Sequence, residues 1–185
     1  TDDGVTTILA LGNDPFSDET GSKGLASLLA KEMDAQVLNA AFPGSTIATK
    51  NVEYQSSYPL DGLSLYWVVA ALANQNFDLM NAVVADLNSL AALNAAETLS
   101  QTDPQKVDMI VIFYDLQDYM GKRIVYDADN DKNINSLCGA LNASIKLIQE
   151  TWPHIRIVVL SAPYGTYTDG DGTQVDPDRD DFGHG

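Results

Sequence analysis

The chain has 185 residues, of which 45% are hydrophobic, so it is long enough for one α/β domain with a sizeable core and too apolar for a disordered chain. Its formal net charge of -16 disfavours binding to nucleic acids and anionic membrane surfaces, because both require a basic protein surface. No apolar stretch approaches the ~18 residues of a membrane-spanning helix. We therefore expect one domain over residues 1–185 with no membrane span.

Apolar runs and helical periodicities alternate along the chain. Short apolar runs bounded by turn residues predict four buried parallel strands, at Val5–Leu11, Gln36–Ala41, Met109–Phe113 and Ile155–Leu160. Apolar residues at helical spacing predict four helices, at Gly24–Met33, Leu63–Ala73, Asp78–Leu99 and Asn135–Thr151. This alternation predicts a flavodoxin-like, three-layer α/β/α sandwich around a parallel sheet with strand order 2-1-3-4.

Three of the predicted strands are followed by polar or glycine-containing turns. The turns read Gly12-Asn13-Asp14, Pro43-Gly44-Ser45 and Asp115-Leu116-Gln117-Asp118-Tyr119. In an open parallel sheet, the carboxyl ends of the strands form the crevice in which ligands bind. We therefore expect the three turns to meet there, although they lie far apart in the sequence.

The residues of these turns and their spacing resemble the SGNH, or GDSL-type, hydrolases from about Val5 to Tyr164. In that family the first turn reads Gly-Asp-Ser with serine as nucleophile, and Asp14 stands at the serine position. The second turn supplies a glycine N–H to the oxyanion hole, which Gly44 matches. The third turn supplies an asparagine donor, and Gln117 occupies its position. In the family a C-terminal Asp-x-x-His supplies the base, and this chain has that spacing at Asp181-Phe182-Gly183-His184.

These replacements bear on catalysis. Serine attack needs a base to remove the proton, and the tetrahedral oxyanion needs preorganised donors. A carboxylate at Asp14 would instead repel a developing oxyanion. Gln117 keeps an amide donor, but its extra methylene shifts that donor by about 1 Å, which can cost roughly a hundredfold in rate. Ser17 and Ser45 are the only hydroxyls near the crevice, and we interpret them as turn hydrogen-bonding groups because neither has a visible base.

Two functions follow from the resemblance. The first is an ancestral ester or O-acyl hydrolase that is catalytically impaired and binds a small-molecule ester, a glycan or a protein partner, with Asn13, Asp118 and Tyr119 as further binding residues. The alternative is an active esterase or acetylhydrolase on carbohydrate or lipid esters, with a rearranged site or a base supplied beyond Gly185. We predict no cofactor and no metal at the site, and the sequence leaves the oligomeric state open.

The chain ends carry further expectations. Residues 165–185 are rich in aspartate and predict an acidic loop or tail. In the family another helix and strand would follow, so we expect the fold here to be incomplete at its C-terminus. The polar start Thr1-Asp2-Asp3-Gly4 fits the product of a removed signal segment. We therefore expect an extracytoplasmic or secreted protein, with a cytoplasmic location as the alternative.

One acidic segment resembles the start of a calcium loop. Oxygen ligands alternate through Asp127, Asp129, Asp131 and Asn133, but Lys132 stands where an EF-hand loop needs glycine. We interpret the segment as a solvated turn that precedes the next helix, and leave calcium binding as the alternative.

Overall fold

The main sheet consists of four parallel strands in the predicted order. The computed structural model describes residues 4–51, 53–162, 166–168 and 171–176. Its sheet order is β2-β1-β3-β4. The strands are β1 (Thr6–Gly12), β2 (Ala35–Asn39), β3 (Met109–Phe113) and β4 (Arg156–Leu160). Each lies within one residue or two of the apolar run that predicted it.

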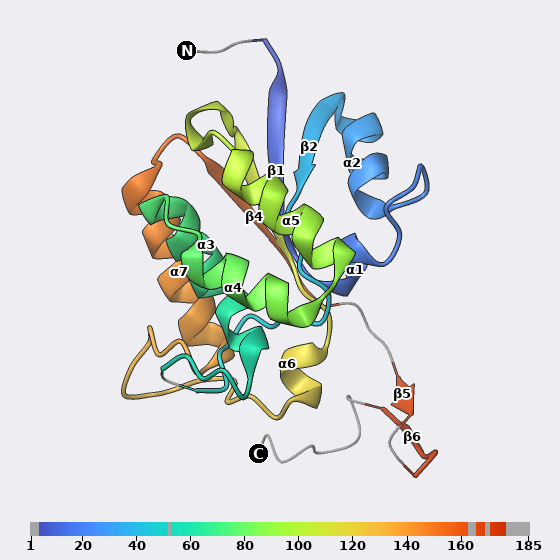
Figure 1. Cartoon of the computed structure of the whole chain (residues 1–185), viewed down its shortest axis with the longest axis vertical. Coiled ribbons are helices and arrows are strands. Elements are labelled where there is room, and N and C mark those ends of the chain that lie inside the picture. The colour runs from blue at the N-terminus through green and yellow to red at the C-terminus, as the bar shows by residue number, and fades with distance from the viewer. Residues whose placement is uncertain (1–3, 52, 163–165, 169–170, 177–185) are drawn as a thin grey trace.

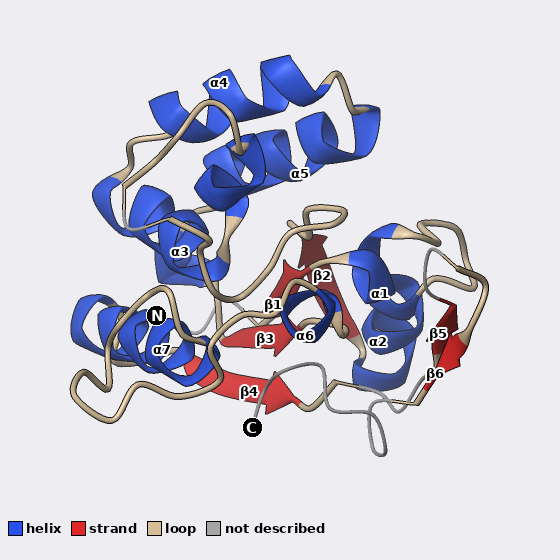
Figure 2. Cartoon of the chain, turned by 90° about the horizontal axis from the view of Figure 1, so that it is seen from below, coloured by secondary structure: helices blue, strands red, loops and turns tan. Residues whose placement is uncertain are grey.

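Helices cover both faces of this sheet, so the predicted three-layer α/β/α sandwich is confirmed (Figures 1 and 2). One face carries α1 (Asp14–Ser17) and α2 (Leu25–Met33). The opposite face carries α3 (Leu65–Asn74), α4 (Asp78–Leu87), α5 (Leu90–Gln101) and α7 (Leu137–Thr151). The connections contain η1 (Pro59–Leu63), η2 (Pro104–Lys106) and α6 (Gln117–Met120).

The side chains of the central strands alternate between two hydrophobic cores. Leu9 and Ile110 point into the larger core beneath the four helices on one face. Ile8 and Val111 point into the smaller core beneath α1 and α2. All four side chains are almost completely buried. Burial on both faces is why the strands read as continuous apolar runs rather than as alternating ones.

The predicted helix over Asp78–Leu99 is wrong in one respect, because it is broken into α4 and α5. Asn88 adopts a left-handed conformation with φ 47° and ends α4. The Ser89 hydroxyl then accepts a hydrogen bond from the Ala92 N–H at 3.3 Å and caps α5. The Asn-Ser pair is a stop and start signal that the continuous Ala- and Leu-rich pattern concealed.

The sheet ends at β4, whose side chains are unusually exposed for an apolar strand. Val158, Val159 and Leu160 are 37%, 42% and 42% exposed. Much of residues 165–185 lies outside the described residues, including His184. Within the described part, β5 (Tyr167–Thr168) and β6 (Gln174–Val175) form a short antiparallel hairpin. None of the described helices is long and apolar enough to cross a membrane.

Candidate functional site

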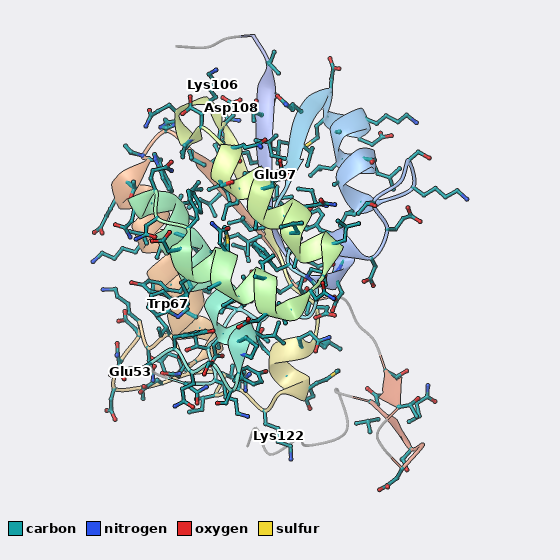
Figure 3. All side chains as sticks on the ribbon, viewed as in Figure 1. Glu53, Trp67, Glu97, Lys106, Asp108 and Lys122 are labelled. Atoms are coloured by element: carbon teal, nitrogen blue, oxygen red, sulfur yellow. The ribbon has the colours of Figure 1, made fainter. Side chains whose placement is uncertain are left out.

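The turns after β1 and β3 lie at the same end of the molecule. Figure 3 shows Lys106 and Asp108, which precede β3, at one end, and Lys122, which follows α6, at the opposite end. Because β1 and β3 are parallel, the turns after both strands lie toward the α6 end. Asp14 begins α1 and Gln117 begins α6, so both short helices start at the carboxyl edge of the sheet.

The side chain of Asn13 links the three turns from inside the protein. Its Nδ2 donates to the Ser45 carbonyl oxygen at 2.9 Å and to Asp115 Oδ1 at 2.7 Å. Its Oδ1 accepts from the Asp115 main-chain N–H at 3.0 Å. The residue is 0% exposed. Asn13 therefore holds the turns in register, and its place in the structure is that of a buried link rather than of a ligand-contacting surface.

The Asp14 carboxylate accepts hydrogen bonds from the two groups that the family resemblance assigns to the oxyanion hole. Oδ1 accepts from the Gly44 main-chain N–H at 2.9 Å, and Oδ2 accepts from Gln117 Nε2 at 3.2 Å. Gly44 has φ 68°, a left-handed conformation that glycine adopts without strain, and this orients its N–H. The three residues predicted to cluster do so. Both donors therefore already bind a negatively charged group of the protein itself.

Asp118 and Asp61 anchor the long loop that follows Gly44. Asp118 is 2% exposed and accepts from the N–H groups of Ile47 and Ala48, both at 2.8 Å. Asp61 is fully buried and accepts from the N–H of Lys50 at 2.6 Å and from the N–H of Asn51 at 3.0 Å. Asp118 was predicted to bind ligand and is placed instead beneath the surface. Nothing in the sequence around Asp61 signalled this role.

Burial and neighbouring charges shift the acidity of Asp115. Burial raises the pKa of its carboxyl group, and the hydrogen bonds from Asn13 and the Gln117 N–H lower it. The nearby carboxylates of Asp14 and Asp18 raise the pKa further. The net direction is upward, so the folded protein favours the protonated form of Asp115 more than water does.

The neighbouring groups of the third turn behave in the same way. Burial raises the pKa of Asp118, while the N–H groups of Ala48 and Ile47 and the charge of Arg123 oppose the rise. Burial and the Asp118 charge raise the pKa of the Tyr114 hydroxyl above its ordinary value. Tyr114 is only 3% exposed and packs in the core, so it offers no aromatic surface to a ligand.

Among the described residues, the two serines near the site have no histidine partner. Ser45 is fully buried, and its hydroxyl donates to the Phe42 carbonyl oxygen at 2.8 Å. Ser17 Oγ is buried and has no hydrogen-bond partner among the described residues. His154 precedes β4, at the end of the sheet away from the site, and its Nε2 lies 3.3 Å from the Pro104 carbonyl oxygen. Neither serine is therefore paired with a described histidine.

The acidic segment that resembles a calcium loop is closed by its own hydrogen bonds. Asp127 Oδ1 accepts from the N–H groups of Asp129 at 3.0 Å and Asn130 at 3.3 Å. Its Oδ2 accepts from Asn133 Nδ2 at 2.7 Å, and this bond contributes most to lowering the Asp127 pKa. Within the described residues no group of three or more His, Cys, Asp or Glu side chains could hold a metal. The geometry is that of an Asx turn leading toward α7.

Two other aromatic residues differ in their surroundings. Tyr119 is partly exposed on α6, beside the carboxyl edge. Trp67 lies on α3 and lines a separate cavity of about 380 Å³ between α3 and α4 (Figure 3). Its ring packs edge-on against Tyr66, with centroids 5.7 Å apart. Of the two, only Tyr119 is positioned to extend the site.

Comparison with known proteins supports the fold. No family model matches the chain. No curated protein matches it either. A possible lipase from Chitinophaga pinensis has a similar structure, with a TM-score of 0.51 and 14% identity over 92% of this chain and 55% of that one. A second solved structure gives a TM-score of 0.53 and 17% identity over 86% of this chain and 58% of that one.

A protein from Lactobacillus plantarum gives a TM-score of 0.49 and 16% identity, over 91% of this chain and 66% of that one. The chain thus spans between 55% and 66% of the length of these structures. At such identities the two matches above 0.5 speak for the fold alone. The class that the fold defines is a three-layer α/β/α domain with a parallel sheet.

Proposed function

We propose that this chain is a divergent SGNH-type domain whose ester-hydrolase site has become a binding site without acyl-transfer activity. The observation that carries the proposal is the position of the Asp14 carboxylate, which accepts from both the Gly44 N–H and the Gln117 amide. In an SGNH-type hydrolase, these two positions would stabilise the oxyanion of the substrate. Here, Asp14 stands at the position of the nucleophile and also accepts hydrogen bonds from both oxyanion-hole donors.

The chemistry of acyl transfer supports this proposal. A tetrahedral intermediate would have to displace the Asp14 carboxylate from both donors while its own negative charge developed nearby, and preorganised donors are usually the largest catalytic contribution. Attack by Asp14 itself would give a mixed anhydride and would not relieve the repulsion from Asp115. Among the described residues no histidine lies at the site, and Asp181 and His184 lie outside them.

The remaining surface favours ligands that donate hydrogen bonds. The donors of Asn13, Gly44 and Gln117 are engaged within the protein, whereas carboxylate oxygens of Asp14 and Asp115 have further lone pairs. Tyr119 adds a partly exposed aromatic ring. A neutral glycan, whose hydroxyl groups donate, fits this surface, as does a cationic group of a protein partner. A polyanion does not, because the chain carries a net charge of -16.

An active esterase is the second candidate function, and the structural similarity to a possible lipase favours it. One esterase assay distinguishes the two candidate functions. We expect the chain to hydrolyse p-nitrophenyl acetate no faster than an unrelated acidic protein. Asp14→Ser should recover activity only if Asp181 and His184 act together with the new serine, because the members of a catalytic triad act as a unit. Saturable turnover that Asp14→Ala abolishes would establish the esterase instead.

Ligand binding is tested with a glycan array followed by calorimetry. A ligand of the proposed site should bind the wild type and bind Asp14→Ala more weakly. The matched control is Asp86→Ala, which removes an exposed carboxylate from α4, well away from the carboxyl edge. Binding that both variants retain would place the ligand elsewhere, and tight binding to heparin would contradict the charge argument.

A further inference from the structure

The outer edge of β2 presents unpaired main-chain groups. β2 is the first strand of the sheet order and pairs only with β1. The Ala40 N–H donates to the Ala10 carbonyl oxygen at 3.0 Å, which fixes the even-numbered residues as those that bond to β1. Because alternate residues of a strand bond to opposite sides, the N–H and C=O groups of Val37 and Asn39 point away from β1.

A cavity of about 660 Å³ lies along this edge. Its floor includes Val37 and Asn39, whose main-chain groups point outward, and Ala41, whose N–H donates to Asn39 Oδ1 at 3.2 Å. Its walls come from α2 on one side and α5 on the other. Figure 2 shows these two helices on opposite sides of β2. The volume is within the range of about 300–1,000 Å³ that is usual for ligand sites.

The walls of this cavity are small and uncharged. Ala26 and Ala30 line it from α2, and Ala91 and Ala95 line it from α5. Leu90, which is 72% exposed, adds apolar surface at the rim. No charged side chain of the described residues lines the cavity. Alanine walls leave width for the side chains of a bound segment, and Leu90 offers them an apolar contact.

We propose that this groove binds an extended segment of a partner protein, which adds to β2 as an outer strand. An alkyl chain would fit the alanine walls, but it would cover the N–H groups of Val37 and Asn39 without pairing them. Leaving a buried donor without an acceptor opposes binding. A peptide strand pairs these groups and places alternate side chains against α2 and α5.

The negative charge of the chain favours neutral or basic peptides. A second copy of the chain would bring another net charge of -16 to the interface, whereas a neutral or basic segment would be attracted. We therefore assign the groove to a segment with small or aliphatic residues at alternate positions and Lys or Arg at its ends. Binding there uses none of Asp14, Gly44 and Gln117, so it is independent of the proposed function.

The test begins with a library of random linear peptides displayed on phage and selected against the full chain. Synthetic versions of the selected peptides are then methylated at one main-chain nitrogen at a time. Strand addition predicts that methylation at every second residue weakens binding by about tenfold or more, because each methyl group removes one interstrand hydrogen bond. Methylation at the intervening residues should have little effect. Amide exchange at Val37 and Asn39 should slow when peptide binds.

Variants of the groove locate the binding. Ala91→Trp places a large ring in the groove from an exposed position of α5 and should abolish peptide binding. Leu93→Trp is the matched control, because Leu93 lies on the same helix, is 54% exposed and does not line the cavity. Val37→Pro removes an outward N–H, which an edge strand tolerates, and should weaken binding without unfolding the chain.

Four results would overturn the proposal. They are a library that yields no binding peptide, methylation effects without a two-residue period, binding that survives Ala91→Trp, and self-association that Ala91→Trp disrupts. The last result, measured by light scattering, would show that a second copy of the chain binds in the groove. A fifth result, loss of peptide binding in Leu93→Trp as well as in Ala91→Trp, would also overturn it, because it would place the contact on the outer face of α5.

Discussion

The Asp14 carboxylate accepts a hydrogen bond from the Gln117 side-chain amide at 3.2 Å, although the two residues are 103 positions apart in the chain. This contact ties the start of α1 to the start of α6. The same carboxylate accepts from the Gly44 N–H, so one side chain joins all three turns at the carboxyl edge of the sheet. Asp14 is therefore a structural link as well as the feature that separates this site from a hydrolase site.

The first prediction concerns the strength of this link. Asp14→Ala and Gln117→Ala each remove one partner, and the double variant removes both. Because the bond involves a charged acceptor at a partly exposed site, we expect a coupling free energy of about 1 kcal/mol between the two residues. Urea unfolding of the wild type and the three variants measures it. Strictly additive losses would mean that the contact contributes nothing to stability.

The second prediction follows from the donors that Asp14 occupies. Asp14→Ala leaves the Gly44 N–H and the Gln117 amide without their carboxylate partner, so this variant should bind acetate while the wild type does not. The measurement is the chemical shift of the Gly44 amide during an acetate titration at constant ionic strength. Asp14→Ala combined with Gln117→Ala is the control and should bind more weakly. An acetate response in the wild type would show that Asp14 does not hold the donors in solution.

The sequence predicted the sheet because the local signals for the strands were strong. The apolar residues 8–11 of β1 and 109–113 of β3 are largely buried and contain no polar residue, so both strands and their turns could be located. The break at Asn88 was missed because a single residue in a left-handed conformation ended α4, while the surrounding pattern stayed helical.

The candidate site was predictable only in outline. Parallel strands bring their carboxyl ends together, so the meeting of Asp14, Gly44 and Gln117 followed from topology. The burial of Asn13 and Asp118 did not, because it depends on which main-chain groups of distant loops need a partner. The sequence also gave no sign that the Asp14 carboxylate would face the two donors, since this depends on the conformation of its side chain.

The third prediction concerns pH. Burial raises the pKa of Asp118 in the folded state above its unfolded value of about 3.9, so the folded state binds the proton more tightly. Its contribution to stability is therefore fully present below the unfolded pKa and is lost as the pH rises through the folded pKa. Asp115 contributes in the same direction. These two groups should lower the free energy of unfolding as the pH rises above about 4, whereas Asp127, whose pKa is lowered, acts in the opposite direction.

The variant Asp118→Asn isolates this effect. Its amide oxygen can accept from only one of the Ile47 and Ala48 N–H groups, so the variant should be less stable than the wild type. It cannot ionise, however, so its stability should change less with pH over the same range. Urea unfolding at several pH values compares the two slopes. Equal slopes would mean that ionisation of Asp118 is not coupled to folding.

The last prediction compares two glycines that shape the site for different reasons. Gly44 has φ 68° and open space around the position of a Cβ, so Gly44→Ala should cost only the backbone strain of about 1–2 kcal/mol. Gly12, at the end of β1, packs against the Phe113 carbonyl group, and a Cβ there would overlap it. Gly12→Ala should therefore separate β1 from β3 and destabilise the chain by more than Gly44→Ala does. Thermal unfolding of both variants tests the order, and a Gly12→Ala variant as stable as the wild type would show that the two strands are not in close contact where the turns begin.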